Sequence, residues 1–97
     1  MAKVYIANNH IHDFKPAAKY GELVDVTKDK APIFKTDVMK HILEEALADF
    51  KKDDYILLTG PTLLCVMITT ILARKFDTIK YLVFDAKLQE YVVRHIN

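Results

Sequence analysis

The sequence predicts a single α/β domain over residues 1–97. Its expected form is a Rossmann-like, mostly parallel sheet of about five strands, with two main helices and a C-terminal antiparallel hairpin. Three observations predict this fold class. Short β-rich runs alternate with apolar segments of helical length, a Gly-Pro turn precedes the second of these segments, and a short polar turn joins the last two runs. Strands that alternate with helices need right-handed crossovers, which favour parallel pairing.

The first third of the chain contains two predicted strands. Residues 3–7 are apolar on both pleat faces, as in a central strand that is covered on both sides. Residues 10–21 show no clean period, although 16–20 fit one helical turn. Residues 22–27 alternate weakly, which predicts a second strand, and the proline-containing segment 28–35 is expected to form a loop.

The first helix has the strongest periodic signal in the chain. Apolar side chains recur at helical spacing from Val38 to Phe50, and charged side chains take the other side. Thr36 is expected to cap this helix, with Asp37 in its first turn, where the helix dipole favours an anion.

A strand at residues 55–58 leads into the second helix. Gly60 is expected to cap that helix and Pro61 to be its first helical residue, where a missing N–H costs nothing. The helix should run from Thr62 to about Phe76. Its apolar side chains nearly encircle it, so we expect it to be buried on most sides.

The last two strands are predicted at residues 79–84 and 89–96, with the turn Asp85-Ala86-Lys87 between them. Two helices cannot cover both faces of a five-stranded sheet. Either residues 10–21 or a second subunit must therefore cover the remainder.

Composition indicates which classes of partner the protein has. Of the 97 residues, 52% are hydrophobic, so some apolar surface is expected to be hidden by a second copy, in a homodimer or higher oligomer. The net charge is +1, and Arg74 and Arg94 are the two arginines, so long nucleic acids are not expected as partners.

A membrane location is not expected either. The uncharged stretch from Tyr55 to Ala73 is close to the roughly 20 residues of a membrane span, but a turn divides it into a strand and a helix that are each too short. The first residues do not form a signal peptide, and Cys65, the one cysteine, cannot form an internal disulfide. These features predict a cytoplasmic protein, in the host cytoplasm if it is viral.

Three polar turns carry the main functional expectation. They follow the first, third and fourth predicted strands, and ligands of open parallel sheets bind beyond the carboxyl ends of the strands. We therefore expect the turns to converge on one edge of the sheet. The ligand-binding residues predicted there are Asn8, Asn9, His10, Thr59, Gly60, Thr62, Asp85 and Lys87.

The turn from Thr59 to Thr62 opens a helix, whose N-terminus offers unpaired N–H groups and a partial positive charge. This arrangement suits the phosphate of a small anionic ligand, and a well-capped helix without a ligand is the alternative. Pro61 removes one donor. The turn also lacks the lysine of a P-loop, so hydrolysis of nucleoside triphosphates is not expected.

His10 and His12 are the candidate catalytic residues, as acid–base groups, with exposed histidines as the alternative interpretation. His41 and His95 fall on other elements, so neither a metal site nor a cofactor is predicted. Cys65 lies within an apolar helix and is expected to be a small buried side chain rather than a nucleophile.

The strand and turn around Thr59, Gly60 and Thr62 resemble the second ligand motif of CARF-type Rossmann-like domains, which sense cyclic oligoadenylates. In that family the turn reads Thr-Gly-Gly-Thr-Lys; here Pro61 replaces a glycine and Leu63 replaces the lysine. Residues 8–13 occupy the place of that family's first ligand loop. Residues 80–94 also resemble small uncharacterised phage proteins.

Three functions follow as hypotheses. The leading one is a non-catalytic, homodimeric protein that binds or sequesters a nucleotide or a cyclic oligonucleotide. The second is an enzyme that cleaves a phosphodiester with His10 or His12, in the manner of a ring nuclease, so the sequence leaves open whether the protein is an enzyme. The third is a protein-interaction or assembly module.

Overall fold

The computed structural model describes residues 2–8, 13–27 and 32–97. These residues form a five-stranded sheet with helices, which confirms the α/β fold class. The elements in chain order are β1 (Lys3–Asn8), the short 3-10 helix η1 (Lys15–Tyr20), β2 (Glu22–Thr27), α1 (Thr36–Ala46), β3 (Tyr55–Leu57), α2 (Thr62–Ala73), β4 (Ile79–Asp85) and β5 (Glu90–Ile96).

The sheet has the strand order β2-β1-β3-β4-β5. The pairs β1–β2, β1–β3 and β3–β4 are parallel, and β4–β5 is the predicted antiparallel hairpin. The chain leaves β1 toward one edge of the sheet and returns past it through α1 to reach β3. The strand order thus reverses between β1 and β3, which is the point where open α/β sheets bind their ligands.

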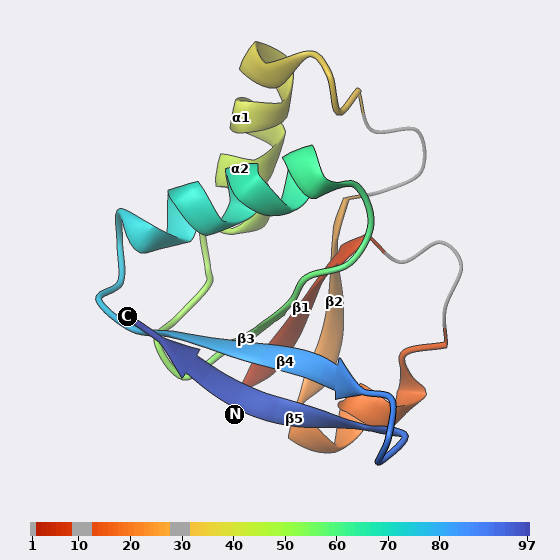
Figure 1. The fold of residues 1–97 in the computed structure, drawn as a ribbon. Coiled ribbons are helices and arrows are strands. Elements are labelled where there is room, and N and C mark those ends of the chain that lie inside the picture. Colours follow the sequence, from red (N-terminus) through yellow and green to blue (C-terminus); the bar gives the residue numbers. More distant parts are fainter. Residues whose placement is uncertain (1, 9–12, 28–31) are drawn as a thin grey trace.

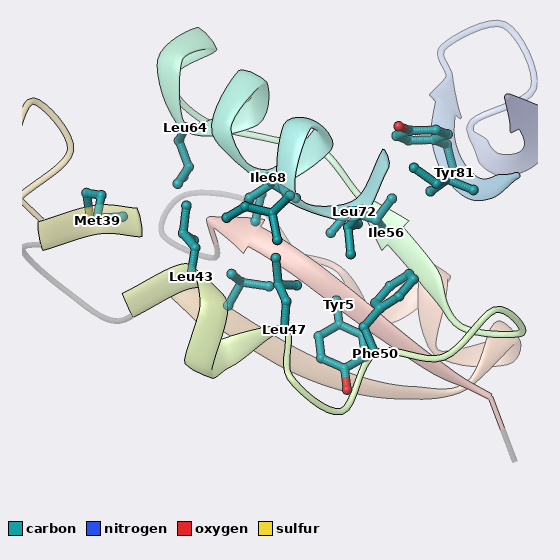
Figure 2. Packing of buried hydrophobic residues seen from close by; sticks show 14 residues of the cluster. Tyr5, Met39, Leu43, Leu47, Phe50, Ile56, Leu64, Ile68, Leu72 and Tyr81 are labelled. Atoms are coloured by element: carbon teal, nitrogen blue, oxygen red, sulfur yellow. The ribbon is translucent and has the colours of Figure 1, made fainter. Parts of the chain in front are cut away.

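Helices α1 and α2 lie together on one side of the sheet, and η1 lies on the other (Figure 1). On the α1–α2 side, Figure 2 shows Leu64 of α2 pointing toward Leu43 of α1, in the same cluster as Tyr5 of β1 and Ile56 of β3. On the η1 side, Phe14 and Ala17 are buried against strand residues of the sheet. The segment before β2 therefore packs on the second face of the sheet. This agrees with the first of the two predicted alternatives, in which residues 10–21 rather than a second subunit cover that face.

The first helix differs from its prediction at both ends. Thr36 is the first helical residue, and Lys35 occupies the N-cap without a side-chain hydrogen bond, so Thr36 is not the cap. The helix ends at Ala46, well before Phe50. Phe50 is still buried, because the turn after α1 brings the chain back to the core. Its ring centroid lies 5.0 Å from that of Tyr5.

The second helix also differs from its prediction. Pro61 is the N-cap rather than the first helical residue, Gly60 precedes it with φ +91°, and the helix ends at Ala73, short of Phe76. Its burial is one-sided: Leu64, Ile68, Ile71 and Leu72 are buried, whereas Val66 is 52% exposed. An apolar helix was expected to be buried on most sides, but α1 lies behind α2 and no element covers its front side in Figure 1.

A buried carboxylate ties the start of the sheet to the loop before β3. Asp54 is 4% exposed, and its side chain accepts hydrogen bonds from the backbone N–H of Lys3 and of Lys51, both at 2.8 Å. The bond from Lys3 joins residues that are 51 positions apart in the chain, and the bond from Lys51 holds the local turn. Asp54 is therefore a structural residue that fixes β1 beside β3.

Buried tyrosines make stability depend on pH in the alkaline range. Burial raises the pKa of Tyr5, Tyr81 and Tyr91. A raised native pKa means that the native state keeps protons which the unfolded chain loses above about pH 10. The stabilising contribution is complete below that pH, and it is lost as the pH rises through the native pKa values.

We therefore expect the free energy of unfolding to fall between pH 9 and 11, by up to about 1.4 kcal/mol per pH unit for each tyrosine that stays protonated. Urea denaturation at stepped pH values measures this slope. Tyr81→Phe should make the slope shallower, and an identical slope in that variant would contradict the assignment.

Candidate functional site

A pocket among the described residues lies at the carboxyl edge of the parallel strands. Its volume is about 700 Å³ and it is open to solvent. It lies between α2, the end of β3 and the projecting β4–β5 hairpin, and it reaches across the end of β3 to the segment before η1. The residues that line it are Asp13, Phe14, Leu57, Leu58, Thr59, Thr69, Tyr81, Leu82, Val83, Phe84, Tyr91 and Ile96.

The pocket exists because neighbouring strands differ in length. Strand β3 has three residues and β4 has seven, and the β3–β4 pairing ends at Leu57 and Leu82. The chain turns away from the sheet at Leu58 toward α2. The last part of β4, with Val83 and Phe84, therefore projects beyond β3 and forms one wall of the pocket.

A close contact joins the ends of β1 and β3 beside this pocket. Gly60 has φ +91°, and a methyl group placed on it would lie 2.7 Å from the Cβ atom of Asn8. Glycine is required here, because a side chain would both strain the backbone and collide with Asn8. The structure thus brings together two of the residues that the sequence predicted at this edge.

The lining of the pocket is mostly apolar and aromatic. Phe84 and Tyr91 form an edge-to-face pair with ring centroids 5.3 Å apart. Asp13 is the one charged residue among the lining residues, and its carboxylate accepts a hydrogen bond from the N–H of Lys15 at 2.9 Å. Burial, together with the charge of Asp13, raises the pKa of Tyr91. Such a lining suits an uncharged ring better than a phosphate.

Helix α2 begins three residues after Thr59, which lines the pocket. Its N-cap, Pro61, makes no side-chain hydrogen bond, and the first helical hydrogen bond runs from the N–H of Cys65 to the carbonyl of Pro61. The N–H groups of the first turn thus have no side-chain cap, and the side chain of Thr62 is exposed. A helix start of this kind can accept an anion.

The other predicted residues have different surroundings. Thr59 lines the pocket. Asp85 accepts hydrogen bonds from the N–H groups of Lys87 and Leu88, at 2.9 and 3.2 Å, so its carboxylate holds the hairpin turn. The Lys87 side chain is exposed and does not line the pocket. Asn9, His10 and His12 lie outside the described residues.

The two described histidines and the cysteine do not line the pocket. His41 lies on α1 beside Glu44, and His95 is exposed on β5. Within residues 2–8, 13–27 and 32–97, no group of three or more metal-ligating side chains comes together. Cys65 donates to the carbonyl of Thr59 at 3.7 Å, and burial raises its pKa, so the thiol stays protonated.

Most residues of the pocket lining were not predicted from the sequence as site residues. Tyr81 was interpreted as core, which it also is, and Asp13 fell within the predicted polar turn at residues 8–13, but the aromatic pair on the hairpin and Phe14 were not proposed. The available signal was the difference in length between the predicted third and fourth strands. Residues of the longer strand beyond the shorter neighbour must lie at an open edge.

Residues 2–97 match the family described as Phage Pam3 gp32-like protein, so the chain belongs to that phage protein family. No curated protein and no solved structure matches the chain. In the part of the chain that the structure describes, no helix is both long and apolar enough to cross a membrane.

Proposed function

We propose that this member of the phage Pam3 gp32-like family is a non-catalytic protein that binds a small nucleotide in the host cytoplasm. The base would lie in the pocket at the carboxyl edge, and the phosphate would lie at the start of α2. The observation that carries the proposal is the pocket itself, whose lining includes Thr59 of the turn that leads from β3 into the start of α2.

The pocket supports the base end of such a ligand. Its volume of about 700 Å³ falls in the range of small-molecule sites. Phe84 and Tyr91 offer a ring surface for stacking, and stacking contributes about 1–3 kcal/mol per base in nucleic-acid binding proteins. Thr59 and Thr69 add hydroxyl groups that can bond to the edge of a base.

The start of α2 supports the anionic end. The carboxylate of Asp13 disfavours a phosphate inside the pocket, whereas the first turn of α2 offers N–H donors and the positive end of the helix dipole. The likeness of Thr59, Gly60 and Thr62 to the turn of CARF-type domains makes cyclic oligoadenylates one ligand class to test.

A nucleotide panel tests this proposal by calorimetry and thermal shift, with mononucleotides, dinucleotides and cyclic oligoadenylates as probes. A bound nucleotide should raise the melting temperature as its concentration rises. Phe84→Ala should weaken binding by about tenfold, because the stacking surface is lost. Leu88→Ala is the control, since Leu88 is another exposed apolar residue of the same hairpin and does not line the pocket.

Three results would count against the proposal. One is the absence of any thermal shift at millimolar nucleotide, and another is equal weakening by Phe84→Ala and Leu88→Ala. The third is conversion of the bound nucleotide during long incubation, which mass spectrometry would detect. That outcome would favour the phosphodiester-cleaving enzyme with His10 or His12 instead.

A further inference from the structure

Two side chains with unused hydrogen-bonding capacity line the carboxyl-edge pocket on the same side of the sheet. Asp13 directly precedes the segment that leads into η1, and Tyr91 belongs to the core cluster on the η1 side. Phe84 is the register partner of Tyr91, so its side chain stands on this side as well. The polar pair and the aromatic wall of the pocket therefore lie together on the side of the sheet opposite α1 and α2 (Figure 1).

The carboxylate of Asp13 is held by its own segment and keeps acceptor positions for a ligand. Its Oδ1 atom accepts the hydrogen bond from the N–H of Lys15, two residues ahead, in the kind of turn that aspartate forms with its own backbone. Phe14 between them is 5% exposed and anchors the segment in the core. Among the described residues, no basic side chain lies within ion-pairing distance of Asp13. A carboxylate has about four acceptor positions, so most of them remain available.

The hydroxyl of Tyr91 is the second available group. Tyr91 is 7% exposed, and the hydrogen bond that it receives from Tyr20 goes to its backbone carbonyl. No described residue bonds to its hydroxyl, although buried tyrosine hydroxyls usually find a partner. The described part of the chain has no fully enclosed side-chain oxygen without a hydrogen bond, so this hydroxyl reaches solvent, and Tyr91 lines the pocket. Burial raises the pKa of Tyr91 and the charge of Asp13 raises it further, which indicates that the two groups lie near one another.

Together the two groups offer an acceptor that cannot donate and a hydroxyl that can. The Watson–Crick edge of guanine is complementary to this pair, because N1–H and the 2-amino group are neighbouring donors and O6 is the acceptor beside them. Adenine and cytosine have an acceptor nitrogen next to the amino group, and uracil has a carbonyl on each side of its N–H. Each of these three bases would turn a lone pair toward the carboxylate, which is unfavourable.

We propose that Asp13 and Tyr91 select guanine as the base of the bound nucleotide, an inference that rests on the proposed nucleotide binding. Asp13 accepts hydrogen bonds from N1–H and the 2-amino group, Tyr91 donates to O6, and the guanine ring stacks on Phe84. The carboxylate then contacts the base and not the phosphate. Guanine nucleotides are therefore the expected ligands, and cyclic oligoadenylates are expected to bind more weakly.

Calorimetry of the full chain with the monophosphates of guanosine, inosine, adenosine and uridine tests this selection. Guanosine monophosphate should bind at least about tenfold more tightly than adenosine monophosphate, because a two-bond contact discriminates between bases to about this extent. Inosine monophosphate lacks only the 2-amino group and should lie between them. Tighter binding of adenosine monophosphate, or of a cyclic oligoadenylate, than of guanosine monophosphate would overturn the proposal.

Asp13→Asn tests the carboxylate through a gain as well as a loss. The variant keeps an oxygen for the N–H of Lys15, but its amide adds a donor. It should bind guanosine monophosphate at least about tenfold more weakly and should bind xanthosine monophosphate more tightly than the wild type does, because the 2-carbonyl of xanthine can accept from the amide. Asp53→Asn is the matched control: it makes the same charge change at an exposed aspartate outside the pocket lining and should bind like the wild type. Equal weakening of all nucleotides by Asp13→Asn, without the gain for xanthosine monophosphate, would contradict the assignment.

Tyr91→Phe tests the hydroxyl, since it keeps the ring and removes a group that no described residue bonds. Guanosine and inosine monophosphates should each bind about fivefold more weakly, whereas adenosine monophosphate, which has no oxygen at position 6, should be unaffected. Equal losses for all three would overturn the role of the hydroxyl. If the wild type binds every nucleotide equally well, only the selection of guanine fails and nucleotide binding stands. If it binds none of them, the proposed function fails and the selection fails with it.

Discussion

Replacing Asp54 with alanine is expected to lower the free energy of unfolding by about 3 kcal/mol. The carboxylate is buried and accepts two backbone hydrogen bonds, each 2.8 Å long. Hydrogen bonds to a charged group contribute more than neutral ones, and their loss leaves the N–H groups of Lys3 and Lys51 without these acceptors. Urea denaturation at pH 7 measures the change, which is large compared with the stability of a small domain.

Two further variants show whether the effect belongs to this carboxylate. Asp53→Ala removes the exposed neighbouring carboxylate and should change the free energy of unfolding by less than about 0.5 kcal/mol. Asp54→Asn keeps the size and one acceptor oxygen, so it should lie between the wild type and Asp54→Ala. Equal stabilities of Asp53→Ala and Asp54→Ala would contradict the role assigned to Asp54.

The second large effect is expected at Gly60. A non-glycine residue at φ +91° is strained, and the added Cβ atom would lie 2.7 Å from Asn8 Cβ. Because Asn8 Cβ is fixed by the β1 backbone, relief requires a shift of the turn. We expect Gly60→Ala to lower the free energy of unfolding by about 2 kcal/mol. Nucleotide affinity should fall as well, because the turn carries Thr59 and the start of α2.

Pro61→Ala provides the comparison within the same turn. Pro61 has φ −59°, which alanine adopts without strain, so this variant should lose less than about 1 kcal/mol. Denaturation and calorimetry on both variants separate the two contributions. Wild-type stability and wild-type affinity in Gly60→Ala would show that the close approach to Asn8 has no consequence.

The sequence predicted the arrangement of elements well, because helix and strand periods are local properties. The order of elements, the parallel core of the sheet and the C-terminal hairpin are confirmed. The ends of the helices were less well predicted, because tertiary packing decides where an apolar series stops being helical. Phe50 shows this: its spacing fits a longer helix, but it reaches the core from a turn after Ala46.

The candidate site was predictable only in part. Asn8, Thr59 and Gly60 could be placed at one edge because parallel strands end at the same side. The aromatic wall formed by Phe84 and Tyr91 could not be predicted in the same way. It depends on how far β4 projects past β3, which is a difference between two strands rather than a property of either one.

The short central strand has a consequence for cooperativity. β3 pairs through three residues with β1 and through three with β4, whereas β4 and β5 share seven register pairs. The two halves of the sheet are thus coupled through its narrowest part. Opening at β3 would separate β1–β2 from the hairpin as two partly independent folding units, with the two helices and η1 as the remaining links between them.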